Sequence, residues 1–200
     1  MTRIVLLVAA AAWLAAAPAN AGLADSLTPD QLKQLNAGQL VVESKDMPGG
    51  VWPQLTVYTL VKAPVATVSG VFRDYDHAQD FQPSIVSAKV VAQPSANVCD
   101  VQYTQKLPLF GTTNFTVQNT YSESKGSVTV SWKLLKSAMA EVSDGSLRVE
   151  PFQSGSIMRY VNYVKPKLGV LAGAAKGEAL NSVKQTVTEL RDEAEKRATK

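Results

Sequence analysis

Apolar and polar side chains alternate along three stretches of the chain, residues 98–107, 114–121 and 127–135. Alternation with a period of two is typical of strands that bury one face and leave the other in water. The positions expected on the dry face are Val101, Tyr103, Phe115, Val117, Tyr121, Trp132 and Leu134. Because short links such as SKGS and QSGS join neighbouring strands, we expect the strands to pair antiparallel.

Further strands are predicted on both sides of this group, at residues 40–43 and 54–62 before it and at the segment SIMRYVNYV after it. The alternation also continues through Leu147, Val149 and Pro151, with Ser146, Arg148 and Glu150 expected to face water. SIMRYVNYV is apolar on both faces, so the pattern leaves its inward face open. An exposed apolar face there would favour contact with another protein.

The C-terminal segment has the spacing of an amphipathic helix. Its apolar residues recur at intervals of three and four, at Leu180, Val183, Val187, Leu190 and Ala194. The residues expected on its outer side are Lys184, Glu189, Arg191 and Glu193. Such a helix can cover the dry face of the sheet. The pattern therefore predicts an α+β fold in which a curved antiparallel β-sheet wraps around a long C-terminal α-helix.

Two shorter helices are predicted nearer the N-terminus. The first follows Thr28, which can cap it together with Gln31, and Gly38 can end it. The second is expected as one helix over residues 63–81, because Pro64 suits a helix start and apolar residues follow at helical spacing.

The first 21 residues are typical of a secretory signal peptide. Arg3 precedes the apolar run IVLLVAAAAWLAAA, and the small residues Ala19 and Ala21 suit cleavage after Ala21. A retained membrane anchor is the alternative, but it needs about 20 apolar residues. We therefore expect a signal peptide (1–21), an N-terminal helix with a short strand (22–50) and a main domain (51–200), in a periplasmic or secreted protein.

The net charge and the absence of known motifs exclude several classes of function. The formal net charge of +3 is too small to favour a nucleic-acid partner. Cys99 is the only cysteine, so no internal disulfide can form, and its apolar neighbours favour a buried thiol. The chain carries no nucleophile elbow, phosphate-binding loop or dinucleotide-binding fingerprint. We predict no catalytic residue and no cofactor.

The stretch VKAPVATVSGVFRDYDHAQDFQPSIVSAKVV resembles the START-like (SRPBCC) superfamily, especially its polyketide cyclase and coenzyme Q-binding branch. The shared pattern is an apolar strand, Ala-Pro, an amphipathic helix, Asp-Tyr, then an aromatic residue and a proline before the next strand. KLPLFGTTNF is similar to the hydrophobic hairpin beside the cavity mouth of these proteins. The resemblance implies a helix-grip fold, with residues 51–200 as a START-like domain. It also implies a hydrophobic ligand such as a lipid, isoprenoid, quinone or sterol-like molecule.

The only histidine, His77, stands among Asp74, Asp76 and Asp80. On one helix, Asp74, His77 and Asp80 would share a face, so a metal site and acid–base catalysis are the functional alternatives. Zinc prefers nitrogen and sulfur ligands, and one histidine with two carboxylates is an uncommon set. The resembling family also implies a structural use of Asp-Tyr. We therefore predict no metal site, and a stretch that closes one end of a pocket.

The predicted pocket joins the dry face of the strands to the small residues of LGVLAGAAKGEAL. A glycine inside a helix costs about 1 kcal/mol relative to alanine, so Gly173 and Gly177 favour room for a ligand. Close packing of the helix on the sheet, or a helix that begins only after Gly177, are the alternatives. Candidate polar contacts are Tyr103, Gln105, Asn119 and Tyr121. The predicted ligand-binding residues are Phe72, Tyr75, Phe81, Val101, Tyr103, Leu109, Phe110, Phe115, Val117, Tyr121, Trp132, Leu134, Tyr160, Gly173 and Gly177.

Residues 106–113 carry more apolar surface than a solvated turn needs. We expect Leu107–Phe110 either to make transient contact with a membrane or a departing ligand, or to fold back onto the C-terminal helix as core. The sequence thus predicts an exported, monomeric carrier of a hydrophobic small molecule. The alternatives are a cyclase- or hydrolase-like enzyme, for which Arg159 and Tyr160 are the first residues to test, and a periplasmic protein-interaction module.

Overall fold

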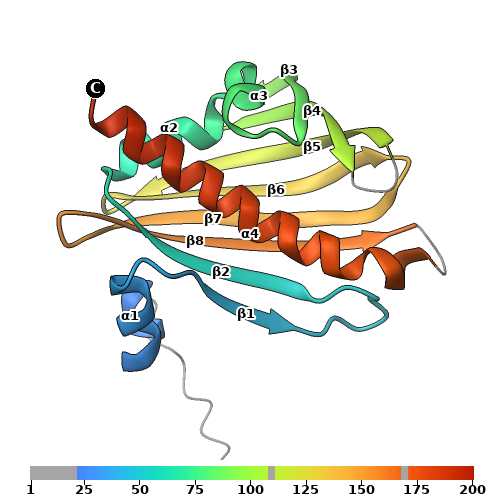
Figure 1. Ribbon diagram of the computed structural model, residues 1–200. Coiled ribbons are helices and arrows are strands. Elements are labelled where there is room, and N and C mark those ends of the chain that lie inside the picture. The colour runs from blue at the N-terminus through green and yellow to red at the C-terminus, as the bar shows by residue number, and fades with distance from the viewer. Residues whose placement is uncertain (1–21, 108–110, 168–170) are drawn as a thin grey trace, which may run out of the picture.

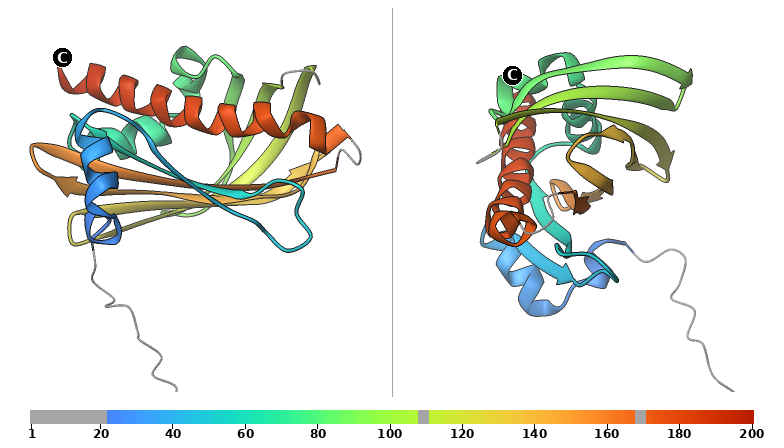
Figure 2. Two further views of the ribbon diagram at one scale, coloured as in Figure 1. Left: turned by 60° about the horizontal axis from the view of Figure 1, so that its bottom comes forward. Right: turned by 90° about the vertical axis from the view of Figure 1, so that its right-hand side faces the viewer.

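The computed structural model describes residues 22–107, 111–167 and 171–200. Within these residues, an eight-stranded antiparallel sheet curves around one long helix, α4 (Leu171–Ala198) (Figures 1 and 2). The strand order is β1-β2-β8-β7-β6-β5-β4-β3. This is the predicted α+β helix-grip arrangement, and the prediction of the fold is confirmed.

The strands follow the predicted alternation but extend beyond it. They are β1 (Val41–Lys45), β2 (Gln54–Val61), β3 (Ile85–Ser95), β4 (Val98–Leu107), β5 (Gly111–Ser124), β6 (Ser127–Ser137), β7 (Ala140–Phe152) and β8 (Gly155–Pro166). The SKGS link is a two-residue hairpin turn, in which Lys125 and Gly126 both have positive φ angles of 52° and 76°. This backbone geometry joins adjacent antiparallel strands without splaying them.

The N-terminal segment covers part of the sheet face opposite α4. It forms η1 (Ala24–Ser26) and α1 (Pro29–Asn36), and the predicted capping box of Thr28 and Gln31 is present. Its buried leucines pack against Tyr58 and Ile157. Glu150 was expected to face water, but it is buried and accepts a hydrogen bond from the Leu23 N–H at 2.6 Å. That expectation was wrong because alternation along a strand does not show what covers the second face.

Residues 63–81 do not form one helix. They divide into α2 (Val65–Arg73), η2 (Tyr75–His77) and α3 (Ala78–Phe81). The break falls at Asp74, whose backbone leaves the helical region at φ −79° and ψ 65°. A carboxylate is unfavourable at the negative end of the helix dipole, and an Asp side chain competes for local hydrogen bonds. Asp74, His77 and Asp80 therefore do not share one helical face.

The packed core lies where α2 and the second half of α4 meet the sheet. Val187, Leu190 and Ala194 of α4 are buried there together with Val68 and Val71 of α2. Figure 1 shows α2 beside the C-terminal half of α4.

The inward face of the last strand, which the sequence left open, is now clear. Met158 of β8 belongs to the core beside α4, whereas Ile157 packs against the N-terminal segment on the other face. Apolar residues lie on both faces at the start of β8 because α4 covers one face there and the N-terminal segment covers the other.

Candidate functional site

A cavity of about 620 Å³ lies between the concave face of the sheet and α4. Among the predicted ligand-binding residues, those that line it are Phe72, Tyr103, Phe115, Val117, Trp132, Leu134 and Tyr160. They come from α2 and from strands β4, β5, β6 and β8, which the curvature of the sheet brings around one space. Residues of β4 to β8 that alternate toward α4 therefore form the wall, as expected for the inward face of a curved sheet.

Aromatic rings form much of this wall. Trp132 lies between Tyr160 and Phe72, with ring centroids 5.1 Å and 5.8 Å away. On neighbouring strands, the rings of Tyr103 and Phe115 are stacked with centroids 5.2 Å apart. These contacts hold large flat surfaces in fixed positions, and such surfaces suit an apolar or aromatic ligand.

One glycine leaves the space that the Trp132 ring occupies. Gly145 on β7 pairs with Trp132 on one side and with Asn162 on the other. A Cβ on Gly145 would come within 2.2 Å of both Trp132 Cζ2 and the Val161 carbonyl oxygen. Any other residue at Gly145 would therefore displace the indole or the strand. No local sequence signal marks Gly145, because the need for a glycine arises only where β7 pairs with β6 and β8.

Carboxamide side chains interrupt the apolar wall, at Gln82, Gln105, Asn119, Asn162 and Gln185. Asn119 and Asn162 both line the cavity, and Asn119 is only 3% exposed. The Nδ2 of Asn119 is buried and has no hydrogen-bond partner among the described residues. Asn119 was one of the predicted polar contacts, whereas Asn162 was missed because the inward face of β8 was undecided.

The two cavity tyrosines stay neutral. Burial raises the pKa of Tyr103 well above its ordinary value, and nearby Tyr75 adds to the effect. Burial also raises the pKa of Tyr160. A protonated phenol can both donate and accept a hydrogen bond. Tyr103 and Tyr160 therefore add uncharged polar groups to the apolar wall.

Helix α4 closes the cavity with small residues, although not with the predicted ones. Gly173 and Gly177 are exposed, and no side-chain or strand atom lies where their Cβ atoms would be. Ala175 and Ala179 line the cavity instead. The placement of the glycines was wrong because successive helical residues turn by about 100°, so a glycine two positions away points elsewhere. The helix also begins before Gly177, at Leu171.

Glu189 is on the cavity side of α4, although it was expected on the outer side. Burial raises the pKa of Glu189, against the opposing effect of a 2.8 Å hydrogen bond from Gln185 Nε2. Glu178 also lines the cavity. The helical wall thus carries carboxyl groups, and the lining includes one basic residue, the exposed Lys106.

Four predicted ligand-binding residues lie elsewhere in the structure. Tyr75 and Val101 are buried in a separate apolar cluster under α3, and Phe81 lies beneath the guanidinium group of Arg197 at 5.5 Å. Tyr121 lines a second pocket. The alternation placed Val101 and Tyr121 on the correct face, but the helices that cover that face differ along the strands. Leu109 and Phe110 lie outside the described residues, so their membrane or ligand contact stays a prediction.

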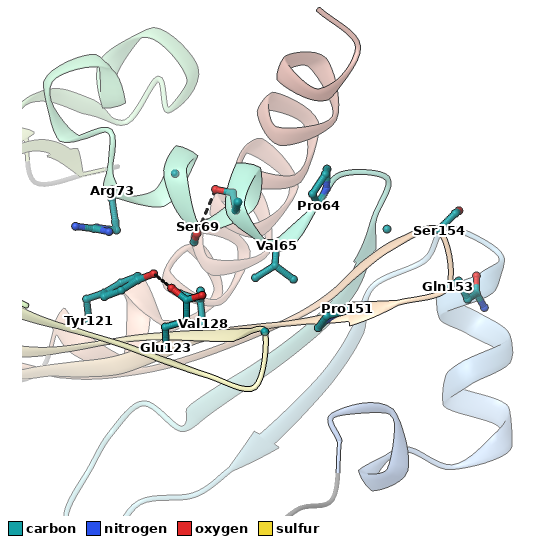
Figure 3. Close-up of a pocket in the computed structure, with 14 residues that line it drawn as sticks. Pro64, Val65, Ser69, Arg73, Tyr121, Glu123, Val128, Pro151, Gln153 and Ser154 are labelled. Atoms are coloured by element: carbon teal, nitrogen blue, oxygen red, sulfur yellow. Dashed lines mark hydrogen bonds between the residues drawn. The ribbon is translucent and has the colours of Figure 1, made fainter.

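The second pocket, of about 700 Å³, lies between α2 and the hairpins that join β5 to β6 and β7 to β8 (Figure 3). The Arg73 guanidinium lies 4.3 Å from the centroid of the Tyr121 ring, and the Tyr121 hydroxyl donates to Glu123 at 2.9 Å. Arg73, Tyr121 and Glu123 thus already interact with one another within this pocket. We take the cavity under α4 as the candidate site because its walls are aromatic and aliphatic.

The His77 cluster forms contacts at the end of α2. Asp74 accepts a hydrogen bond from Arg197 of α4 at 2.8 Å and lies 2.6 Å from His77 Nδ1. Burial acts to raise the pKa of Asp74, but the hydrogen bonds from His77 and Arg197 outweigh it and lower the pKa. Among the described residues, no group of three or more His, Cys, Asp and Glu side chains could hold a metal ion. The geometry thus links two helices.

Arg159 and Tyr160, the first residues to test for an enzyme, lie on opposite faces of β8. Tyr160 lines the cavity, whereas Arg159 alternates to the other face, opposite Tyr58 of β2 and Arg148 of β7. Consecutive strand residues point to opposite sides of a sheet. These two residues therefore cannot act together on one ligand in the cavity.

Solved structures with the same architecture are known, although no family model and no curated protein sequence matches the chain. A STAR-related lipid transfer protein fragment from Xanthomonas axonopodis is 15% identical, with a TM-score of 0.69 over 78% of this chain and 93% of that chain. Human StAR-related lipid transfer protein 5 is 8% identical, with a TM-score of 0.67 over 80% and 84%. The Zhui aromatase/cyclase from a Streptomyces species is 14% identical, with a TM-score of 0.62 over 72% and 94%. At these identities the likeness shows the shared fold.

Proposed function

We propose that this chain, which has the START-like helix-grip fold, binds a hydrophobic small molecule between the sheet and α4. The observation that carries the proposal is the cavity of about 620 Å³ with its wall of aromatic and aliphatic side chains. Small-molecule sites in proteins usually have volumes of roughly 300–1,000 Å³ and a mostly apolar lining. The lipid transfer proteins of the same fold, which are named for this activity, add support.

A cavity of this kind would allow a hydrophobic molecule to be carried through water. Exposure of a hydrocarbon chain to water costs about 0.8 kcal/mol for each CH₂ group, so a lipid does not leave a membrane readily. An apolar cavity lowers this cost by enclosing the chain. Among the described residues, no helix is both long and apolar enough to cross a bilayer. We infer that the bound molecule is carried, and that it leaves chemically unchanged.

Mass spectrometry of solvent extracts from the native protein tests the proposal. We expect a hydrophobic compound in near-stoichiometric amount. Ala179→Trp should lower the recovered amount several-fold, because Ala179 lines the cavity and an indole would occupy it. Asn181→Trp is the matched control, since Asn181 is exposed on the same helix. Its yield of ligand should equal that of the wild type.

Two results would contradict the carrier proposal. If extracts from wild type and variants alike contained no bound compound, the cavity would not hold a ligand in the native protein. Conversion of a polyketide or ester substrate by the purified protein, lost in Ala179→Trp and kept in Asn181→Trp, would show an enzyme that uses the same cavity.

We further propose that the chain is exported and begins at Gly22 after cleavage of residues 1–21. The small residues Ala19 and Ala21 support this site, as does the setting of the residue that would become the N-terminus. The Gly22 nitrogen donates to Asp25 Oδ2 at 2.8 Å, and Glu150 Oε2, which accepts from the Leu23 N–H, lies 3.3 Å from where a Gly22 Cβ would be. A charged α-ammonium group at Gly22 would therefore donate to the Asp25 carboxylate, with the Glu150 carboxylate on the neighbouring residue, and this setting favours it.

Intact-mass measurement on protein from its native host tests the export proposal. We expect the mass of residues 22–200 in a periplasmic or secreted fraction. In the processed protein, Asp25→Ala should lower the melting temperature by more than it does in protein that retains Met1, because only the processed chain has an α-ammonium group at Gly22. A mass that includes Met1 in the native host would contradict export.

A further inference from the structure

We propose that Asn119 recognises a neutral oxygen atom, carbonyl or hydroxyl, at the buried end of the ligand. The inference rests on the proposed function and adds a chemical class to it. The ligand is then neither a pure hydrocarbon nor a molecule that buries a carboxylate at this point.

The side-chain amide of Asn119 is buried and unpaired among the described residues. A buried polar group is almost always hydrogen-bonded, so a group without a partner calls for a reason. Asn119 is 3% exposed and its Nδ2 has no partner among the described residues, although the residue lines the cavity. Rotation about the side-chain χ2 bond exchanges the amide nitrogen and oxygen. The carboxamide can therefore turn its two donors toward a ligand.

The neighbours of Asn119 cannot supply the missing acceptor. Its partners across the strands are Cys99 on β4 and Trp132 on β6. The indole N–H of Trp132 is only a donor, and the thiol of Cys99, which donates to the Tyr75 hydroxyl at 3.8 Å, is only a weak acceptor. An acceptor from within the cavity is the remaining means of pairing the amide.

The surroundings select against charge on that acceptor. The cavity wall is largely aromatic and aliphatic, and the ionisable side chains that α4 adds to it are the exposed Glu178 and the half-buried Glu189. Lys106, the basic lining residue, is exposed at the end of β4. Burial of an unpaired carboxylate beside carboxyl groups is strongly unfavourable. A carbonyl or hydroxyl oxygen avoids that cost and still accepts the hydrogen bond.

Three fluorescent probes of one shape can test this selection. 2-Acetylanthracene carries a carbonyl group, 2-isopropylanthracene has the same shape without it, and anthracene-2-carboxylate carries a charge. Their dissociation constants would be measured by fluorescence titration with wild type and with Asn119→Leu. A net hydrogen bond contributes a factor of roughly 2 to 10 in affinity. We expect the preference for acetyl over isopropyl to fall by about that factor in Asn119→Leu, and the carboxylate to bind wild type more weakly than the ketone.

Leu134→Met is the matched control, because Leu134 lines the same cavity and the change conserves volume without touching a donor. It should alter the affinities for the acetyl and isopropyl probes together. The melting temperature of Asn119→Leu should equal or exceed that of wild type, because the change removes an unpaired buried donor.

Three outcomes would overturn the inference. An unchanged acetyl preference in Asn119→Leu would show that Asn119 does not donate to the ligand. A large fall in melting temperature would show that the amide is structural. Tighter binding of the carboxylate than of the ketone would contradict the neutral acceptor. Failure of wild type to bind any probe would count against the proposed function itself, and the inference would fall with it.

Discussion

The two halves of α4 face the same sheet but meet different surroundings. In the second half, Val187, Leu190 and Ala194 are packed against the sheet with α2 alongside. In the first half, Ala175 and Ala179 face the cavity. Helix α2 lies beside the C-terminal half of α4 and does not reach its first half, as Figure 1 shows. The open space therefore lies beyond the end of α2, where that helix no longer packs beside α4.

The largest expected effect separates the two halves by stability. Leu190→Ala should destabilise the protein by roughly 2–5 kcal/mol, because Leu190 is 2% exposed and its removal leaves a void in a packed region. Leu134→Ala, at the cavity, should cost only about 1–2 kcal/mol, since the lost atoms adjoin space that is already open. Urea denaturation of both variants measures the difference. Equal losses would show that the two regions are packed alike.

Gly145→Ala should disturb the cavity wall by displacing the Trp132 ring that packs on Gly145. The added methyl group would meet the Trp132 ring and the Val161 carbonyl oxygen, each within 2.2 Å. We expect a loss of roughly 1–3 kcal/mol from this overpacking and weaker binding of a hydrophobic probe, because the indole must move. Chemical denaturation and fluorescence titration report the two effects. Unchanged probe affinity would mean that Trp132 is not part of the binding wall.

Gly177→Ala should have a smaller effect of opposite sign. Gly177 is exposed and its Cβ would meet no atom outside its own helix, so alanine gains helix propensity without a clash. We expect a stabilisation of about 0.5–1 kcal/mol with unchanged ligand binding. Gly70→Ala on α2 is a second site with open space for a Cβ, where a similar gain is expected. If Gly177→Ala bound ligand more weakly, Gly177 would belong to the cavity wall after all.

The smallest expected effect is a pH dependence at the packed end. The hydrogen bond to Asp74 raises the pKa of His77 above the ordinary 6.5, and the pKa of Asp74 lies below its ordinary 3.8. The His77 contribution is thus fully present below pH 6.5 and is lost as the pH rises through its raised pKa. The Asp74 contribution is present above pH 3.8 and is lost as the pH falls through its lowered pKa.

Melting temperatures between pH 5 and 9 check this dependence. Wild type should lose a small amount of stability as His77 is deprotonated, and His77→Gln should lack that step. Because His77 is exposed, the step should shrink in high salt. A step of the same size in His77→Gln would assign it to another group.

The sequence predicted the fold well because its signals are local. Alternation marked the dry side of β4, β5 and β6, and the three- and four-residue spacing marked the buried side of α4 from Val183 to Ala194. The capping box at Thr28 and the Lys125–Gly126 turn depend only on residues close in the chain. Propensity, capping and periodicity act over a few residues, so a single sequence can reveal them.

The candidate site was only partly predictable, because a ligand wall depends on partners distant in the chain. The sequence determined that Val101, Tyr121 and Trp132 share the inward face, since side chains on a strand alternate. Only the tertiary structure decided that Trp132 lines the cavity, Val101 lies under α3 and Tyr121 lies under α2. It also decided which face of β8 is inward. Periodicity shows which way a residue points, whereas the packing of one element against another determines what it meets.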